Sequence, residues 1–401
     1  MAISIIMRNQ TKNDYSKSFF TIVVAFGILI STTYFFDRPQ ESNASAFLTS
    51  QENLEVGRLI FLTVSIGIFI SAFIHRVFSK TSGPVAVYNY DVLSIKSQYT
   101  CILVSALLLI INVLIRSISL LYSRNEYLPS SWDIGLVSNT IAYLSYIAVF
   151  SCAVVAIQYK SLLLRLYAWM NIFCWLIFYL SSASRSVILI PISFIFVKNL
   201  NSSFQRNKIR EFGSLFLTIF LYSFTLNSRK TNTWGFKHIL NEIKFNLEFN
   251  LSSAFNIISN INSSISIAGA TKNLSRFSTN DLLLSINPLP GFLTSWSNQS
   301  DALRINLYVP FSAFGEIASL GYPILLFSVF LLFSIFIIQR NWFVMKYGLN
   351  GIITKIHLGL IYGTTFLMLQ YNLRASMRVV YLSILISVGA RLNLFSKIKK
   401  D

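Results

Sequence analysis

The sequence predicts an all-α protein that crosses a membrane about ten times. Hydrophobic residues make up 54% of its 401 residues and charged residues only 12%, and the mean hydropathy is +0.59. Soluble domains carry about 25% charged residues, so a soluble chain of this length would lack the charges to cover its surface. Several segments also contain the roughly 18 to 20 apolar residues that a membrane-spanning helix needs.

Ten segments fit membrane-spanning helices. In chain order they are 18–36, 59–78, 100–122, 135–158, 162–180, 186–200, 212–227, 317–338, 353–372 and 379–395. The apolar core of the first is longer than that of a cleaved signal peptide, so we expect it to be a membrane anchor. The sixth and seventh segments are short for a span.

The distribution of charge predicts the orientation. With ten spans both termini lie on one side, and placing that side in the cytoplasm puts 19 of the 33 Lys and Arg residues inside, with only 4 of the 15 acids. The inner side then carries a net charge of +15 and the outer side +3. This is the positive-inside bias of membrane proteins. Because topology accounts for the positive charge, we expect a lipid bilayer and no nucleic acid as a partner.

One long hydrophilic segment, residues 228–310, divides the chain. It separates an N-terminal bundle of about seven spans, residues 1–227, from a C-terminal segment of about three, residues 311–401. The count of spans places it outside. Residues 251–267 fit a helix that lies on the membrane, and NPLPG at 287–291 is typical of a turn. A loop this long is usually functional or disordered, and its many apolar residues argue against disorder.

Five arginines lie at the predicted outer ends of spans: Arg185, Arg229, Arg304, Arg374 and Arg378. Arginine at a helix end can simply extend its charge into the headgroup region. Two placements favour a second interpretation. Arg374 and Arg378 would repel each other on one helix face, and Arg185, within SSASRS, would open a helix whose dipole disfavours a cation. A bound phosphate explains both placements, because the arginine fork matches phosphate oxygens.

The order of these segments resembles the Wzy-type family of O-antigen and capsular polysaccharide polymerases. The resemblance covers about Leu162 to the C-terminus, through SSASRS, the large outer loop, FGEIASLGYP and LRASM. It implies the architecture of glycosyltransferases that use lipid-linked donors (the GT-C type). It also implies polymerisation of undecaprenyl-pyrophosphate-linked repeat units at the outer face of the bacterial inner membrane, without cofactor or metal. A chain-length regulator protein is a further implied partner.

The resemblance implies that arginines hold the donor pyrophosphate, with Arg185 and Arg374 as the best matches. Charge on the pyrophosphate grows as the glycosidic bond breaks, and nearby arginines would stabilise it. A general base for the acceptor hydroxyl would come from Glu316 of FGEIASLG, with His238, Asp301 and Glu242 as further candidates. Glu316 also fits a simpler role, since an acid is favoured near a helix N-terminus.

Three other functions remain open. An O-antigen ligase shares the donor and the architecture, and His238 in the outer loop keeps that function possible. A polysaccharide flippase would have more spans and short loops. A membrane O-acyltransferase would carry an intramembrane histidine, for which His75 and His357 are candidates.

Overall fold

The computed structural model describes residues 19, 21–34, 50–78, 95–126, 136–158, 161–184, 234–245, 251–274, 277–289, 304–306, 309–347 and 352–392, with isolated positions between 187 and 225 and between 293 and 299. These residues are nearly all helical. Five helices among them are long and apolar enough to cross a bilayer: α2 (Gln51–Phe78), α3 (Ile95–Arg116), α6 (Leu162–Ser181), α14 (Tyr322–Tyr347) and α16 (Leu373–Arg391). The chain therefore has the helices of a membrane protein.

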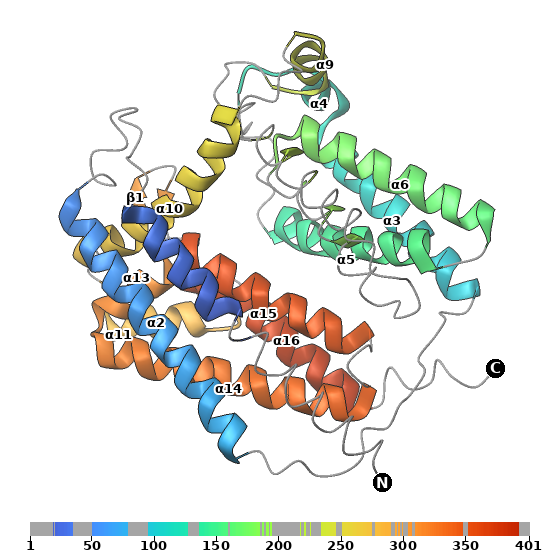
Figure 1. The fold of residues 1–401 in the computed structure, drawn as a ribbon. Coiled ribbons are helices and arrows are strands. Elements are labelled where there is room, and N and C mark those ends of the chain that lie inside the picture. Colours follow the sequence, from blue (N-terminus) through green and yellow to red (C-terminus); the bar gives the residue numbers. More distant parts are fainter. Residues whose placement is uncertain are drawn as a thin grey trace. The chain divides into compact units, whose positions relative to one another are not determined.

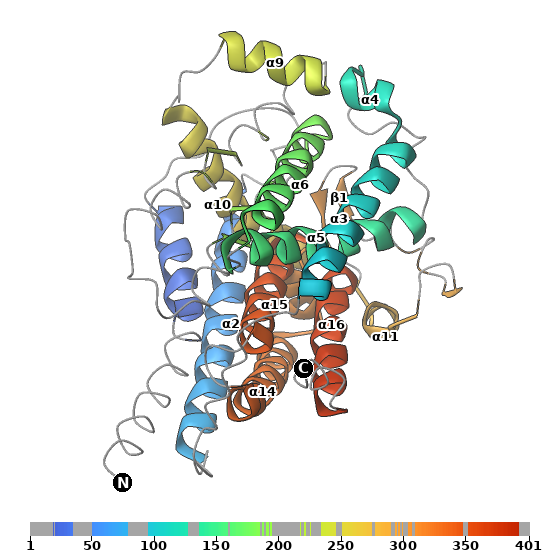
Figure 2. The same cartoon turned by 90° about the vertical axis from the view of Figure 1, so that its right-hand side faces the viewer.

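The chain folds into two compact units, and the first joins its two ends. This unit comprises residues 1–89 and 258–401. Helix α2 packs on α14, which also contacts α15 (Ile352–Gln370), and α15 packs on α16. Figures 1 and 2 show these four helices running side by side. The shorter helix α13 (Ala313–Ser319) contacts all four.

Aromatic rings fill the centre of this unit. Phe61 of α2 and Phe314 of α13 are fully buried, and the ring of Phe26 meets both edge to face. In contrast, Phe69 and Phe327 are more than half exposed on the outside of their helices. Buried rings with exposed apolar side chains around them are what a bundle surrounded by lipid requires.

Two glycines bring α2 against α10 (Leu251–Leu274). A Cβ added at Gly57 would lie 2.0 Å from the Ile265 carbonyl oxygen, and one at Gly269 would lie 1.8 Å from that of Asn53. Asn273 of α10 also donates a hydrogen bond to the Asn53 side chain. The predicted helix at 251–267 is present and extends to Leu274. The prediction that it lies on the membrane is wrong for its second half, because from Ser264 to Thr271 this helix is buried in the protein.

The second unit, residues 90–257, contains a bundle of α3, α5 (Leu136–Gln158) and α6. Hydrogen bonds between side chains join its helices. Ser105 of α3 donates to Asn171 of α6 and accepts from Trp175, at 2.9 and 3.0 Å. Short helices α4 (Ile118–Tyr122) and α9 (Phe236–Phe245) lie beside the end of α6.

Four predicted boundaries are wrong. The predicted span at 100–122 is two helices, since α3 ends at Arg116 and Ser117, with φ 60°, separates it from α4. Helix α2 begins at Gln51 and not near residue 59, because its polar first turns pack on α10. The predicted span at 317–338 is two helices, since Gly321 with φ 121° ends α13 before α14 begins. Helix α16 begins at Leu373 and not near residue 379. The predicted spans at 186–200 and 212–227 lie almost entirely outside the described residues.

Candidate functional site

Helix α13 is fixed to the turn between α15 and α16 by two backbone groups of that turn. The Ala313 N–H donates to the Tyr371 carbonyl oxygen at 2.9 Å. The Leu373 N–H donates to the Glu316 Oε2 at 2.7 Å. Asn372 caps α16 locally, because its Oδ1 accepts from the Ala375 N–H at 3.0 Å. Glu316 and Asn372 thus together satisfy N–H groups that a helix start leaves without an intrahelical partner.

Glu316 is fully buried at this joint. Its Oε1 has no hydrogen-bond partner among the described residues. Burial raises the pKa of its carboxyl to about 8, against the opposing effect of the Leu373 N–H, and the nearby Asp281 raises it further. The carboxyl is therefore protonated at neutral pH, since removing an ionised carboxylate from water costs much more than burying the acid.

Arg374 follows Leu373 in the first turn of α16, and its side chain is buried. Its guanidinium donates to the carbonyl oxygens of Leu284 and Leu289, and it lies over the ring of Trp296 at 4.8 Å from the ring centre. Leu284 belongs to the last turn of α11 (Thr279–Ile286). A cation is favoured at the carbonyl end of a helix. The placement of Arg374 therefore has an explanation within the protein, without a bound anion.

Helix α11 is held at both ends. At its start Ser278 and Asp281 form a reciprocal cap, and Gln299 donates to the other carboxylate oxygen of Asp281. At its end Tyr381 of α16 donates to the Ile286 carbonyl oxygen. Helix α16 thus carries two side chains, Arg374 and Tyr381, that hold the last turn of α11 and the residues just after it.

Arg378 and Arg304 differ from Arg374 in exposure. Arg378 lies one turn after Arg374 on α16, and its side chain is exposed. Arg304 is exposed in β1 (Arg304–Asn306), which pairs with β2 (Val309–Pro310) in antiparallel register. Both arginines can therefore meet a ligand at the surface of the first unit.

The structure brings together only some of the residues that the sequence singles out. Glu316 and Arg374 meet at the start of α16, with Arg378 one turn away. Arg185 and Arg229 lie outside the described residues.

The other acid–base candidates lie elsewhere. His238 is in α9 of the second unit, and Asp301 lies outside the described residues. His357 is fully buried in the first unit, 2.9 Å from the Gln339 Oε1, which also accepts from Ser383 at 2.9 Å. Within the described part of the chain, no group of three His, Cys, Asp or Glu side chains is arranged to hold a metal ion.

Sequence reasoning misses the partners of Arg374 and the role of Tyr381. Both depend on a segment about 85 to 95 residues earlier in the chain. The Asn372 cap has a sequence signal, because Asn directly before a helix is a favoured N-cap. Comparison of the chain with protein-family models, curated proteins and solved structures found no match in any of the three.

Proposed function

We propose that this protein polymerises undecaprenyl-pyrophosphate-linked oligosaccharide repeat units into O-antigen or capsular polysaccharide. In this proposal it lies in the bacterial plasma membrane with ten spans, both termini cytoplasmic and residues 228–310 outside. The growing glycan leaves its pyrophosphate and is transferred to a sugar hydroxyl of the next lipid-linked unit. A chain-length regulator protein is a further partner in this proposal.

The observation that supports the proposal best is the meeting of two motifs. FGEIASLG and LRASM are the segments through which the C-terminal part resembles the polymerases. They are joined by the buried hydrogen bond between Glu316 and the Leu373 N–H, across 57 residues of sequence. A direct contact between the two motif segments is expected if both contribute residues to one site.

The arginines divide into two roles under this proposal. Arg378 and Arg304 are exposed and are the candidates of the first unit for contact with the pyrophosphate. Arg374 keeps the α11 segment in place and acts as a positioning residue for Arg378. Arg185 and Arg229 remain proposed pyrophosphate ligands on the grounds of their sequence context. Exposed guanidinium groups aimed at the leaving group would stabilise the charge that develops on it.

The geometry favours a supporting role for Glu316, because its carboxyl is fully buried and accepts a hydrogen bond from the backbone N–H of Leu373 in α16. A role as general base requires direct reach to the acceptor hydroxyl. Replacement by glutamine separates the two roles. Glutamine keeps an oxygen for the Leu373 N–H but cannot accept the proton.

Deletion of the gene tests the proposal. Flipping and ligation would still work, so surface glycan should remain but carry one repeat unit for each lipid A core. Loss of all attached units, with long lipid-linked chains accumulating, would instead identify a ligase. Retention of the single lipid-linked unit on the cytoplasmic face would identify a flippase.

A further inference from the structure

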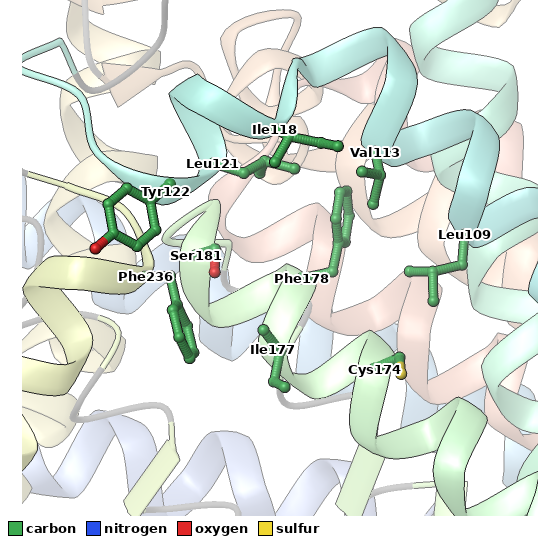
Figure 3. A pocket seen from close by; sticks show the side chains of 10 residues that line it. All are labelled: Leu109, Val113, Ile118, Leu121, Tyr122, Cys174, Ile177, Phe178, Ser181 and Phe236. Atoms are coloured by element: carbon green, nitrogen blue, oxygen red, sulfur yellow. The ribbon is translucent and has the colours of Figure 1, made fainter.

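The second unit contains an apolar pocket at one end of its bundle. Its volume is about 390 Å³. Figure 3 shows the ten side chains that surround it, which come from α3, α4, α6 and α9. They are Leu109, Val113, Ile118, Leu121, Tyr122, Cys174, Ile177, Phe178, Ser181 and Phe236. Most of this lining is hydrocarbon, so the pocket suits an apolar ligand and offers water few partners.

A backbone contact builds the wall of this pocket. Arg124, just after α4, exchanges two hydrogen bonds of 2.9 Å with Trp234, just before α9. Gly235 adopts φ 113°, and a Cβ there would lie 2.5 Å from the Tyr122 carbonyl oxygen. Only a glycine permits this approach. The contact fixes Phe236, the first residue of α9, in the lining of the pocket.

The pocket runs from the ends of two spanning helices toward their middle. Leu109 lies seven residues before Arg116 at the end of α3, and Cys174 lies seven residues before Ser181 at the end of α6. Seven helical residues cover about 10 Å. Both helix ends are on the predicted outer side, where Tyr122 and Ser181 contribute hydroxyl groups to the lining.

Cations gather at this same end. The Arg116 guanidinium lies 5.0 Å from the centre of the Phe178 ring, which lines the pocket. The Arg124 guanidinium is also near, but it is buried and donates to backbone carbonyl oxygens, among them that of Ser181 at 2.7 Å, so Arg116 and the exposed Lys237 are the cations that can face a ligand. Lys237 is exposed next to Phe236, and Glu126 is an exposed acid in the same region. An apolar pocket with positive charge at its mouth matches a lipid that has a hydrocarbon chain and an anionic head.

We infer that this pocket binds one chain of an anionic phospholipid of the bilayer, with the phosphate of that lipid near Arg116. The chain occupies the apolar part between Leu109 and Phe178. The guanidinium meets the phosphate as a charged donor, an arrangement that arginine geometry favours. This site is independent of the proposed polymerase activity, since its lining residues and Arg116 take no part in that activity.

Lipid binding by the purified full-length protein tests the inference. Native mass spectrometry would count bound lipid after titration with phosphatidylglycerol or with phosphatidylcholine of the same acyl chains. We expect one tightly bound phosphatidylglycerol and no comparable phosphatidylcholine. Equal binding of the two lipids would overturn the inference. Displacement of phosphatidylglycerol by an equal amount of undecaprenyl phosphate would also overturn it, because the pocket would then serve the prenyl donor.

Two pairs of variants locate the site. Val113→Phe fills the pocket and should abolish tight binding, whereas Leu114→Phe, at a side chain 69% exposed on the same helix, should leave it unchanged. Arg116→Gln should weaken phosphatidylglycerol binding about fivefold, the effect of one cation near a membrane surface. The control Arg165→Gln changes an exposed cation at the start of α6 and should have no effect. Equal effects within either pair would contradict the site.

A second measurement uses the wild-type protein. Cys174 lines it and is exposed. Alkylation of Cys174 by an apolar thiol reagent should slow when phosphatidylglycerol is added and not when phosphatidylcholine is added. An unchanged rate with phosphatidylglycerol would overturn the inference without reliance on the folding of any variant.

Discussion

Glu316 and Leu373 are joined by a hydrogen bond of 2.7 Å from the Leu373 N–H to the Glu316 Oε2. The bond connects the short helix α13 with the start of α16. The Glu316 carboxyl is fully buried, and its other oxygen, Oε1, has no hydrogen-bond partner among the described residues. The protonation state of one side chain therefore bears directly on the position of α16.

The first prediction concerns the pH dependence of thermal stability. Burial raises the pKa of Glu316 from 4.5 to about 8. Between these values the folded protein binds more protons at this site than the unfolded chain, so stability falls as pH rises across that interval. The melting temperature of Glu316→Gln, measured from pH 5 to 9, should fall less than that of wild type. Glu52→Gln, at an exposed acid of α2, should follow wild type.

The same glutamine variant separates support from catalysis. Glu316→Gln keeps an acceptor for the Leu373 N–H, so we expect normal protein levels and, under the proposed function, near-normal glycan chain lengths. Glu316→Ala removes the acceptor from a buried N–H and should lower stability by about 1–3 kcal/mol. Loss of chain elongation in the Gln variant at normal protein level would assign Glu316 as the general base instead.

The third prediction contrasts Arg374 with Arg378. Lysine has one nitrogen and no planar fork, so Arg374→Lys should lose a contact with the Leu284 or Leu289 carbonyl oxygen and lower the melting temperature. Arg378→Lys should leave the melting temperature unchanged, because that side chain is exposed. Under the proposed function Arg378→Lys should still shorten the glycan. A stable Arg374→Lys protein would contradict the holding role of Arg374.

The fourth prediction tests the close packing of α2 on α10. Gly269→Ala should destabilise the protein by about 1–3 kcal/mol, because its Cβ would overlap the Asn53 carbonyl oxygen and the helices would have to separate. Gly363→Ala is the matched control, since a Cβ there would have no neighbour within 4 Å. Thermal unfolding of both variants in one detergent provides the comparison. Equal melting temperatures would refute the packing.

The fifth prediction concerns orientation. Single cysteines at Asn280 of α11 and at Ser161 before α6 would be introduced after replacement of the three native cysteines. Both positions are exposed, so their labelling reports access from each side of the membrane. An impermeant thiol reagent applied to intact cells should label the cysteine at position 280 and not the one at 161. The reverse pattern would invert the proposed topology.

Hydropathy and charge predict the class of fold but not the local breaks. An apolar window runs across Gly321 and hides the division between α13 and α14, although glycine next to Tyr-Pro is a turn signal. The first turn of α16 is too polar to count as part of a span, so Arg374 is predicted to lie before the tenth span. Its cap, Asn372, is the signal that identifies the true start.

The partners of Arg374 illustrate what a single sequence leaves out. Its cation is predicted to need an anion, and the fold supplies backbone carbonyl groups from a distant segment instead. Every residue has a backbone carbonyl group, so the sequence does not indicate which of them will lie near Arg374. Tertiary packing decides this. The proximity of Glu316 to the LRASM segment is likewise a product of the fold, although the resemblance selects both segments.

The most direct test of the account is reconstitution of the purified full-length protein in proteoliposomes with a single lipid-linked repeat unit. The lipid-linked products would be separated by length. The account predicts chains of many repeat units, with shorter chains from Arg378→Lys at equal protein amount. Recovery of the single unit unchanged, from protein that is folded and correctly oriented, would contradict it.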